Sequence, residues 1–239
     1  MDKTPKKTAP QGLSPLLATD VPNSPLLTTF FHDKELLARL KKHQVAILQF
    51  HGPLPAKPTY AGYSGSLFSV PYEGLDVLLK LKRRWKGKAP SYLAYEPIVA
   101  RALRTQRAAL ACGHVNRVVG VVWMATAAQL MPDPTLSWGV LLERIPTAQT
   151  LAVYVTAHPS RKAQLLADIN TVAECLWEQQ IVVDVGGINN IITDAAGKIW
   201  FVNIENEDVT RQVTNQAAKA RYLEGIDKYA SRTMRRATD

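Results

Sequence analysis

Residues 181–205 read Ile181-Val-Val-Asp-Val-Gly-Gly-Ile-Asn-Asn-Ile-Ile-Thr-Asp-Ala-Ala-Gly-Lys-Ile-Trp-Phe-Val-Asn-Ile-Glu205 and carry the strongest indication of the fold. Two apolar runs, at 190–193 and 199–204, flank the sequence Asp194-Ala-Ala-Gly197, and this pattern predicts a short hairpin. Directly before the stretch, apolar residues recur at intervals of three and four over 160–180, which predicts a long amphipathic helix. A second helix is expected over 210–230, so the back of the chain is predicted to be mainly helical.

Strand signals dominate the sequence upstream of this stretch. Apolar runs at 45–50, 60–70, 75–81, 115–124 and 138–145 predict strands, and the turn sequence at 71–74 predicts a hairpin. Helices are expected at 33–43, where Asp33 is a candidate N-cap, and at 91–107, which contains Glu96. The order predicts an α+β fold, with an antiparallel sheet within 45–145 followed by a mainly helical part.

Composition and charge narrow the class of protein. The chain has 239 residues, of which 46% are apolar, so it can form a substantial core. Its net charge of +9 favours anionic partners, although we interpret the basic clusters at 80–84, 101–107 and 232–236 as solvated surface. Residues 1–25 are predicted to be a disordered leader. Two cysteines and the absence of a long apolar run favour an intracellular protein, cytoplasmic or nuclear, without a membrane span.

Four residues in the front part suit the binding of phosphate groups. Gly62 and Gly65 precede an apolar strand, and glycines there let backbone N–H groups approach a phosphate. Lys80 closes the next strand, with Lys82 as the alternative lysine two residues on. Glu96 follows Lys80 by sixteen residues in the predicted helix 91–107, where its carboxylate could orient that lysine.

The motifs together resemble the protein-kinase-like superfamily over residues 60–206. Val77-Leu-Leu-Lys80 resembles the strand that carries the kinase lysine, and Glu96 has the spacing of its glutamate partner. Phe201-Val-Asn-Ile-Glu205 resembles the Ile-Asp-Phe-Glu variant of the kinase Asp-Phe-Gly motif, with Asn203 at the aspartate position. The resemblance implies an antiparallel β N-lobe over 26–145 and a truncated, mainly helical C-lobe over 146–239.

The same resemblance assigns roles within the stretch 181–205. Asp184 matches the catalytic aspartate, and Asn189 lies five residues later, at the spacing of the metal-binding asparagine. Asn190 fits the downstream spacing better, because it precedes Asn203 by thirteen residues, so both asparagines stay candidates. Glu205 lies two residues after Asn203, on the same face of a strand, and could compensate for the missing aspartate. The implied cofactors are ATP and magnesium.

Several departures from the kinase pattern predict impaired phosphotransfer. Val182 and Val183 stand where the kinase loop has His and Arg, and Asn203 offers magnesium a neutral amide instead of a carboxylate. Only 36 residues follow Asn203, too few for a complete kinase C-lobe. The resemblance thus implies a degenerate, pseudokinase-like transferase that binds ATP weakly.

Two other functions remain open. A kinase-like fold could serve as a non-catalytic scaffold, and we expect a protein partner. The third reading is a basic nucleic-acid-binding domain, which would need aromatic side chains interleaved with basic residues on one face. Tyr60, Tyr63, Phe68 and Tyr72 lie near the basic cluster 80–84, but several of them are expected in the core. Nucleic acid is therefore not the partner we expect, and neither is a membrane.

Overall fold

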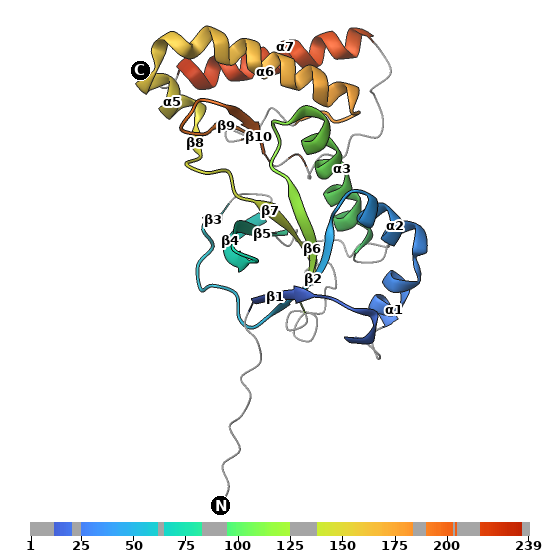
Figure 1. Cartoon of the computed structure of the whole chain (residues 1–239). Helices are drawn as coiled ribbons and strands as arrows, with labels where there is room; N and C mark the ends of the chain where they lie inside the picture. The colour runs from blue at the N-terminus through green and yellow to red at the C-terminus, as the bar shows by residue number, and fades with distance from the viewer. Residues whose placement is uncertain are drawn as a thin grey trace, which may run out of the picture. The chain divides into compact units, whose positions relative to one another are not determined.

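The computed structural model describes residues 12–20, 25–61, 65–82, 95–124, 138–183, 190–202, 204 and 216–235. The chain forms two compact units, shown with their elements in Figure 1. Unit 1 comprises Met1–Ala102 and Val118–Glu143, and unit 2 comprises Leu103–Arg117 and Arg144–Asp239. The chain therefore passes between the units three times, whereas the sequence analysis placed a single boundary after residue 145.

Unit 1 is built on a seven-stranded mixed sheet. In spatial order its strands are β1 (Gly12–Pro15), β2 (Ala46–His51), β6 (Val118–Met124), β7 (Trp138–Glu143), β5 (Leu75–Lys82), β4 (Gly65–Tyr72) and β3 (Tyr60–Ala61). The α+β class is as expected, but the prediction of an antiparallel sheet is wrong at one pair, because β2 and β6 run parallel. A parallel pair needs a long crossover, and the chain from β3 to the helix α3 (Glu96–Cys112) supplies one.

The predicted disordered leader is wrong for residues 12–15. Strand β1 pairs antiparallel with β2, and the backbone N–H of Leu16 donates to the carbonyl of Ile47 at 2.9 Å. Leu16 is buried in unit 1, so the segment is held by side-chain burial as well as by hydrogen bonds. A short 3-10 turn, η1 (Ala18–Asp20), follows. Residues 1–11 and 21–24 lie outside the described ranges.

Local signals explain the turns and helix starts of unit 1. Strands β4 and β5 form the predicted hairpin, and its two turn residues, Glu73 and Gly74, both have positive φ, as a two-residue hairpin turn requires. Helix α1 (Pro25–His32) is followed by α2 (Lys34–Lys42). The predicted N-cap is confirmed, because the Asp33 side chain accepts a hydrogen bond from the backbone N–H of Leu36 at 2.9 Å.

The core of unit 1 has two parts, one of them aromatic. Phe30 of α1 packs against Tyr95 and Trp138, with ring centroids 5.0 and 5.1 Å apart respectively. The second part is a cluster on the sheet, to which β2, β4, β5, β6 and β7 contribute; its members include Leu48, Val70, Val77, Leu79, Val122 and Leu141. Consecutive residues Val121 and Val122 are both fully buried, so both faces of β6 are covered.

Unit 2 packs helices against a small sheet. Strands β8 (Gln149–Thr150), β9 (Ile191–Thr193) and β10 (Ile199–Phe201) form an antiparallel sheet in the order β10-β9-β8, which confirms the predicted hairpin. Within the described residues, the helices of unit 2 are α5 (Leu151–Ala157), the short η3 (Pro159–Arg161), α6 (Lys162–Glu178), α7 (Gln216–Arg235) and the part of α3 from residue 103 onward. Helix α6 confirms the long predicted helix and buries Leu165, Ile169, Val172, Ala173 and Leu176.

Asp194 shapes the β9–β10 turn. Its Oδ1 accepts hydrogen bonds from the backbone N–H groups of Ala196 and Lys198, both at 3.0 Å, and its Oδ2 accepts from Trp200 Nε1 at 3.1 Å. Gly197 adopts φ +82°, and a Cβ at this position would come within 2.2 Å of the Tyr154 hydroxyl. The turn sequence therefore satisfies both the local hydrogen bonds and the close packing against α5.

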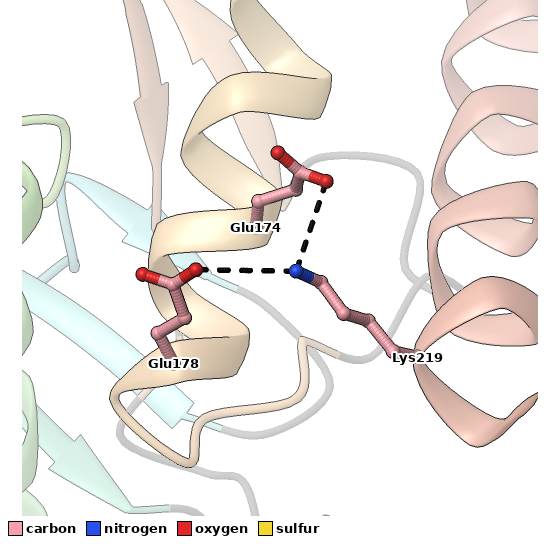
Figure 2. Close-up of polar contacts among 3 residues, drawn as sticks. All are labelled: Glu174, Glu178 and Lys219. Carbon is pink, nitrogen blue, oxygen red and sulfur yellow. Dashed lines mark ion pairs between the residues drawn. The ribbon is translucent and has the colours of Figure 1, made fainter. Parts of the chain in front are cut away.

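Helix α7 packs on α6 as predicted, but with a different set of residues. Leu223 packs against the core, whereas Ala217 and Ala220 are exposed. Closer to the end of α7, the residues buried in the core are Ile226, Ala230 and Met234. Lys219 lies between two glutamates of α6, with its Nζ 3.8 Å from Glu174 Oε1 and 3.9 Å from Glu178 Oε1 (Figure 2). Val213, also predicted at this contact, lies outside the described ranges.

A disulfide joins Cys112 of α3 to Cys175 of α6, with Cα atoms 5.8 Å apart. The sequence analysis took the small number of cysteines as typical of a reducing, intracellular compartment, whereas in the structure both cysteines are oxidised to a disulfide. Sixty-three residues separate them in sequence, so only the packing of unit 2 brings them together. Two hydrogen bonds also join residues 103–117 to the rest of unit 2. Arg107 Nη2 donates to the carbonyl of Gln179 at 2.6 Å, and the backbone N–H of Phe201 donates to the carbonyl of His114 at 2.8 Å.

Candidate functional site

Lys80 lies inside the sheet of unit 1. Strand β5 runs between β4 and β7, and Lys80 is paired with Leu67 on one side and Val140 on the other. Its neighbours Val77 and Leu79 belong to the apolar cluster on the sheet, and side chains alternate along a strand, so Lys80 points to the opposite face. Only 9% of Lys80 is exposed. Lysine is almost never buried without a specific reason, so this side chain stands out in the unit.

The surroundings of Lys80 disfavour its charge. Burial, and to a lesser extent the positive charge of Arg101 on α3, together lower the pKa of Lys80 to about 7. Both effects act in the same direction, because desolvation and a nearby cation each penalise the ammonium form. A group that titrates near neutral pH in a buried position is a common mark of a functional site.

Glu96, the predicted partner of Lys80, is the first residue of α3 and is exposed. Its negative charge contributes to raising the pKa of Tyr95, after the effects of burial and of Asp33. The charged group of α3 that acts on Lys80 is instead Arg101, five residues further along the helix. The sequence analysis thus identified the correct helix, but it assigned Arg101 to a solvated basic cluster.

The other phosphate-binding candidates of unit 1 lie around β4. Gly65 is buried at the start of β4 and pairs with Lys82 of β5. Gly62 and the side chain of Lys82 lie outside the described part of the chain, so the alternative between Lys80 and Lys82 rests on the observed burial of Lys80.

One predicted metal ligand of unit 2 lies in the described residues. Asn190 directly precedes β9 and is 8% exposed, and its carbonyl accepts a hydrogen bond from the backbone N–H of Val202 at 2.9 Å. This bond extends the β9–β10 ladder by one pair. Asn190 is therefore held by the hairpin that the sequence predicted. The other candidates of this unit, Asp184, Asn189, Asn203 and Glu205, lie outside the described ranges.

Buried hydrophobic residues precede and follow the part of the chain that carries the predicted metal ligands. Ile181 and Val183 follow α6 and are buried, and Ile204 is buried after β10. The backbone N–H of Val183 lies 3.4 Å from the hydroxyl of Tyr222 on α7. Within the described ranges, no group of three or more His, Cys, Asp or Glu side chains is placed to hold a metal ion.

No protein-family model matches the chain, and no curated protein matches it either. Among the helices that the structure describes, none has both the length and the apolar character needed to cross a membrane. The buried Lys80 beside Arg101 is the feature of the described residues that points most directly to a binding site.

Proposed function

We propose that this chain is a protein-kinase-like domain that binds ATP weakly through Lys80 and is impaired in phosphotransfer. The observation that carries the proposal is the burial of Lys80 on a strand beside a second cation from α3. The buried ammonium of Lys80 and the partly buried guanidinium of Arg101 repel each other, and an anion next to Lys80 would offset this repulsion. The triphosphate of a nucleotide has the required charge.

The remaining roles follow from the resemblance to kinases. Gly62 and Gly65 would let the backbone approach the phosphates, and Glu96 would be available on α3. Asp184 would orient the attacking hydroxyl, and Asn189 or Asn190, together with Asn203 and Glu205, would hold magnesium. The metal, when bound, supplies positive charge that neutralises the phosphate oxygens.

The donor set fits magnesium poorly. Among the five proposed ligating or positioning residues of 184–205, only Asp184 and Glu205 carry carboxylates, and the others carry neutral amides. Magnesium prefers carboxylate oxygens and nearly ideal octahedral geometry. We therefore expect nucleotide binding to depend little on magnesium and phosphotransfer to be slow or absent.

Nucleotide binding is tested by isothermal titration of the full chain with ATP, with and without magnesium. Lys80→Met should weaken binding by about tenfold or more, since it removes one buried charge contact with the phosphates. Lys41→Met is the matched control, because it removes the same charge from an exposed position on α2. Equal affinity of wild type and Lys80→Met would contradict the proposal.

Proton uptake gives a second readout of the same contact. A phosphate next to Lys80 raises the pKa of this group above its value of about 7 in the free protein. Titration with ATP at slightly alkaline pH, in buffers of different ionisation enthalpy, should therefore show uptake of protons. Lys80→Met should abolish that uptake.

The loss of phosphotransfer is tested with two substitutions in the predicted motif. If Asn203→Asp creates ATP turnover where the natural protein has none, the motif is correctly assigned. If the natural protein already turns over ATP at ordinary kinase rates and Asp184→Ala abolishes this activity, the degenerate interpretation is wrong.

A further inference from the structure

One end of the α6–α7 pair in unit 2 gathers basic residues from both helices. The two helices are antiparallel neighbours: Lys219 contacts Glu174 and Glu178, and further along the pair Asn170 Nδ2 donates to Asp227 Oδ1 at 3.5 Å (Figure 1). Eight residues beyond Asp227 is Arg235, and eight residues before Asn170 is Lys162. Both steps cover about 12 Å of helix, so the last turn of α7 lies level with the first turn of α6.

This end of the helix pair is defined here as the basic end of unit 2; its members are Arg161, Lys162, Arg232 and Arg235. Arg161, Arg232 and Arg235 are exposed, and Lys162 is half-buried. The sequence contains no Asp or Glu between residues 144 and 167, and none between 228 and 238. The acidic residues of the pair begin more than one helical turn away, with Asp168 on α6 and Asp227 on α7, and Glu174 and Glu178 meet Lys219 toward the other end.

Helix dipoles do not account for this arrangement. A helix C-terminus carries about half a negative charge, which would attract the two arginines at the end of α7. The N-terminus of α6 lies beside it with about half a positive charge, so the two partial charges offset each other. Arg161 and Lys162 nevertheless add two further cations at the start of α6, where acidic residues would be favoured.

We propose that the basic end of unit 2 binds the phosphate backbone of duplex nucleic acid without regard to base sequence. Three of its four cations are arginines, whose planar guanidinium groups can contact phosphate oxygens through two hydrogen bonds. The net charge of +9 would attract a long polyanion over distance. This inference goes beyond the proposed ATP binding and does not depend on it.

The nature of the surface favours a duplex over other anionic partners. Single-stranded nucleic acid is usually held by exposed aromatic rings, but Tyr154 of α5 is buried and Tyr229 of α7 is half-buried against the core. A membrane-binding helix inserts an apolar face, and α7 uses its own apolar residues Ile226, Ala230 and Met234 in the core. The basic end presents positive charge on a helical surface, and such a surface suits contacts to phosphates.

The test is fluorescence anisotropy of the full chain with a labelled DNA duplex of about 20 base pairs, from about 50 to 200 mM NaCl. If each of the four cations contacts one phosphate, the logarithm of the association constant should fall linearly with the logarithm of the salt concentration, with a slope of about −3.6. Arg161→Glu/Lys162→Glu should weaken binding by about tenfold or more at low salt and reduce the slope by about 2. Acidic residues suit the start of α6, so the variant should keep its circular dichroism spectrum.

The matched control is Lys41→Glu/Lys42→Glu, which makes the same change of charge at exposed positions on α2. Its affinity should stay within about twofold of wild type, because a contact surface responds more strongly than net charge alone. Arg232→Gln/Arg235→Gln is the second variant from the basic end and should also weaken binding. Lys80→Met should leave duplex binding unchanged, which separates this proposal from that of ATP binding.

The following results would overturn the proposal. They are absence of duplex binding at low salt, equal weakening by the α2 control, strong dependence on base sequence, and preferential binding to vesicles containing about one third phosphatidylserine. The last result would assign the basic end to an anionic lipid surface instead. Binding that survives both basic-end variants would place the contact elsewhere on the chain.

Discussion

Two lysines, one in each unit, occupy opposite environments. Lys80 is buried in the sheet of unit 1, and the neighbouring charge that lowers its pKa is another cation, Arg101. Lys219 of unit 2 lies between Glu174 and Glu178 at the surface, where the glutamate side chains are 52% and 68% exposed. Partly exposed ion pairs such as those of Lys219 contribute little to stability, whereas a buried cation beside a cation costs stability.

The comparison separates structural charges from functional ones. Lys219 joins α7 to α6 through partners of opposite charge, a contact that is favourable but weak. Lys80 has no comparable benefit from Arg101, because their interaction is repulsive. A residue that costs folding stability in this way is a strong candidate for binding a ligand, and here the ligand would be an anion.

The largest expected effect is that of Lys80→Met on the pH dependence of stability. At a pH below about 7 the ammonium is charged in both states and its full cost is present; between about 7 and 10.5 the unfolded chain binds more protons, so stability rises with pH. The shift corresponds to a cost on the order of 4 kcal/mol at low pH. At low pH, Lys80→Met should be more stable than wild type by that amount. In urea denaturation, its free energy of unfolding should not show the rise with pH that wild type shows.

The control for this measurement is Lys41→Met, an exposed lysine of the same unit that should keep the wild-type pH profile. A Lys80→Met variant that is less stable than wild type at pH 6 would show that the buried amine makes a net favourable contribution, and the comparison with Lys219 would fail.

The disulfide provides the second test, because it supports unit 2 alone. Cys112→Ser/Cys175→Ser should lower the free energy of unfolding of unit 2 by about 4 kcal/mol, since the bond closes a loop of 63 residues. Thermal unfolding with and without a reducing agent should show the same loss in wild type. The double variant should not respond to reductant, and an equal melting temperature of wild type in both conditions would contradict the prediction.

Each unit has a hairpin turn that contains a glycine, and substitution of these two glycines allows the turns to be compared. Gly74 and Gly197 both have positive φ, but an added Cβ at Gly74 meets nothing within 4 Å, whereas at Gly197 it would meet the Tyr154 hydroxyl at 2.2 Å. Gly74→Ala should cost about 1 kcal/mol from backbone strain, and Gly197→Ala about 2 to 3 kcal/mol because steric overlap is added. Chemical denaturation of both variants measures the difference, and equal losses would mean that Tyr154 moves aside freely.

The smallest expected effect is at Lys219. Lys219→Met should destabilise unit 2 by at most about 1 kcal/mol, because both glutamates are largely solvated. The loss should shrink further as salt is raised to about 1 M, where charges are screened within a few ångströms. A loss that does not depend on salt would show that the packing of the lysine chain, rather than its charge, stabilises the α6–α7 contact.

The sequence predicted the strand and the helix that carry the candidate site, but not which of their side chains lie close together. Lys80 was selected because it closes an apolar strand before a helix, and that strand and helix exist as β5 and α3. The charge of α3 that acts on Lys80 in the structure is that of Arg101, and a role for Glu96 at a nucleotide site stays a prediction, since a spacing along the chain does not specify which face of a helix meets the sheet. Arg101 was passed over because several other arginines share its cluster, and sequence alone does not show which of them is near a buried group.

Features that depend on residues close together in the chain could be predicted from the sequence alone. These are the N-cap at Asp33, the β4–β5 turn at Gly74, the hydrogen-bonded turn at Asp194 and the long helix α6. Each is stabilised by contacts within a few residues or by a regular apolar period, so its signal is present locally.

Contacts between segments far apart in the sequence could not be predicted and became known only from the folded chain. The parallel pairing of β2 with β6, the addition of β1 to the sheet and the Cys112–Cys175 bond all join segments far apart in sequence. The burial of Lys80 and the face that α7 presents to the core depend in the same way on neighbours from other elements. Such contacts are selected by the packing of the whole unit, because many local patterns are compatible with several partners and only one arrangement fills the core.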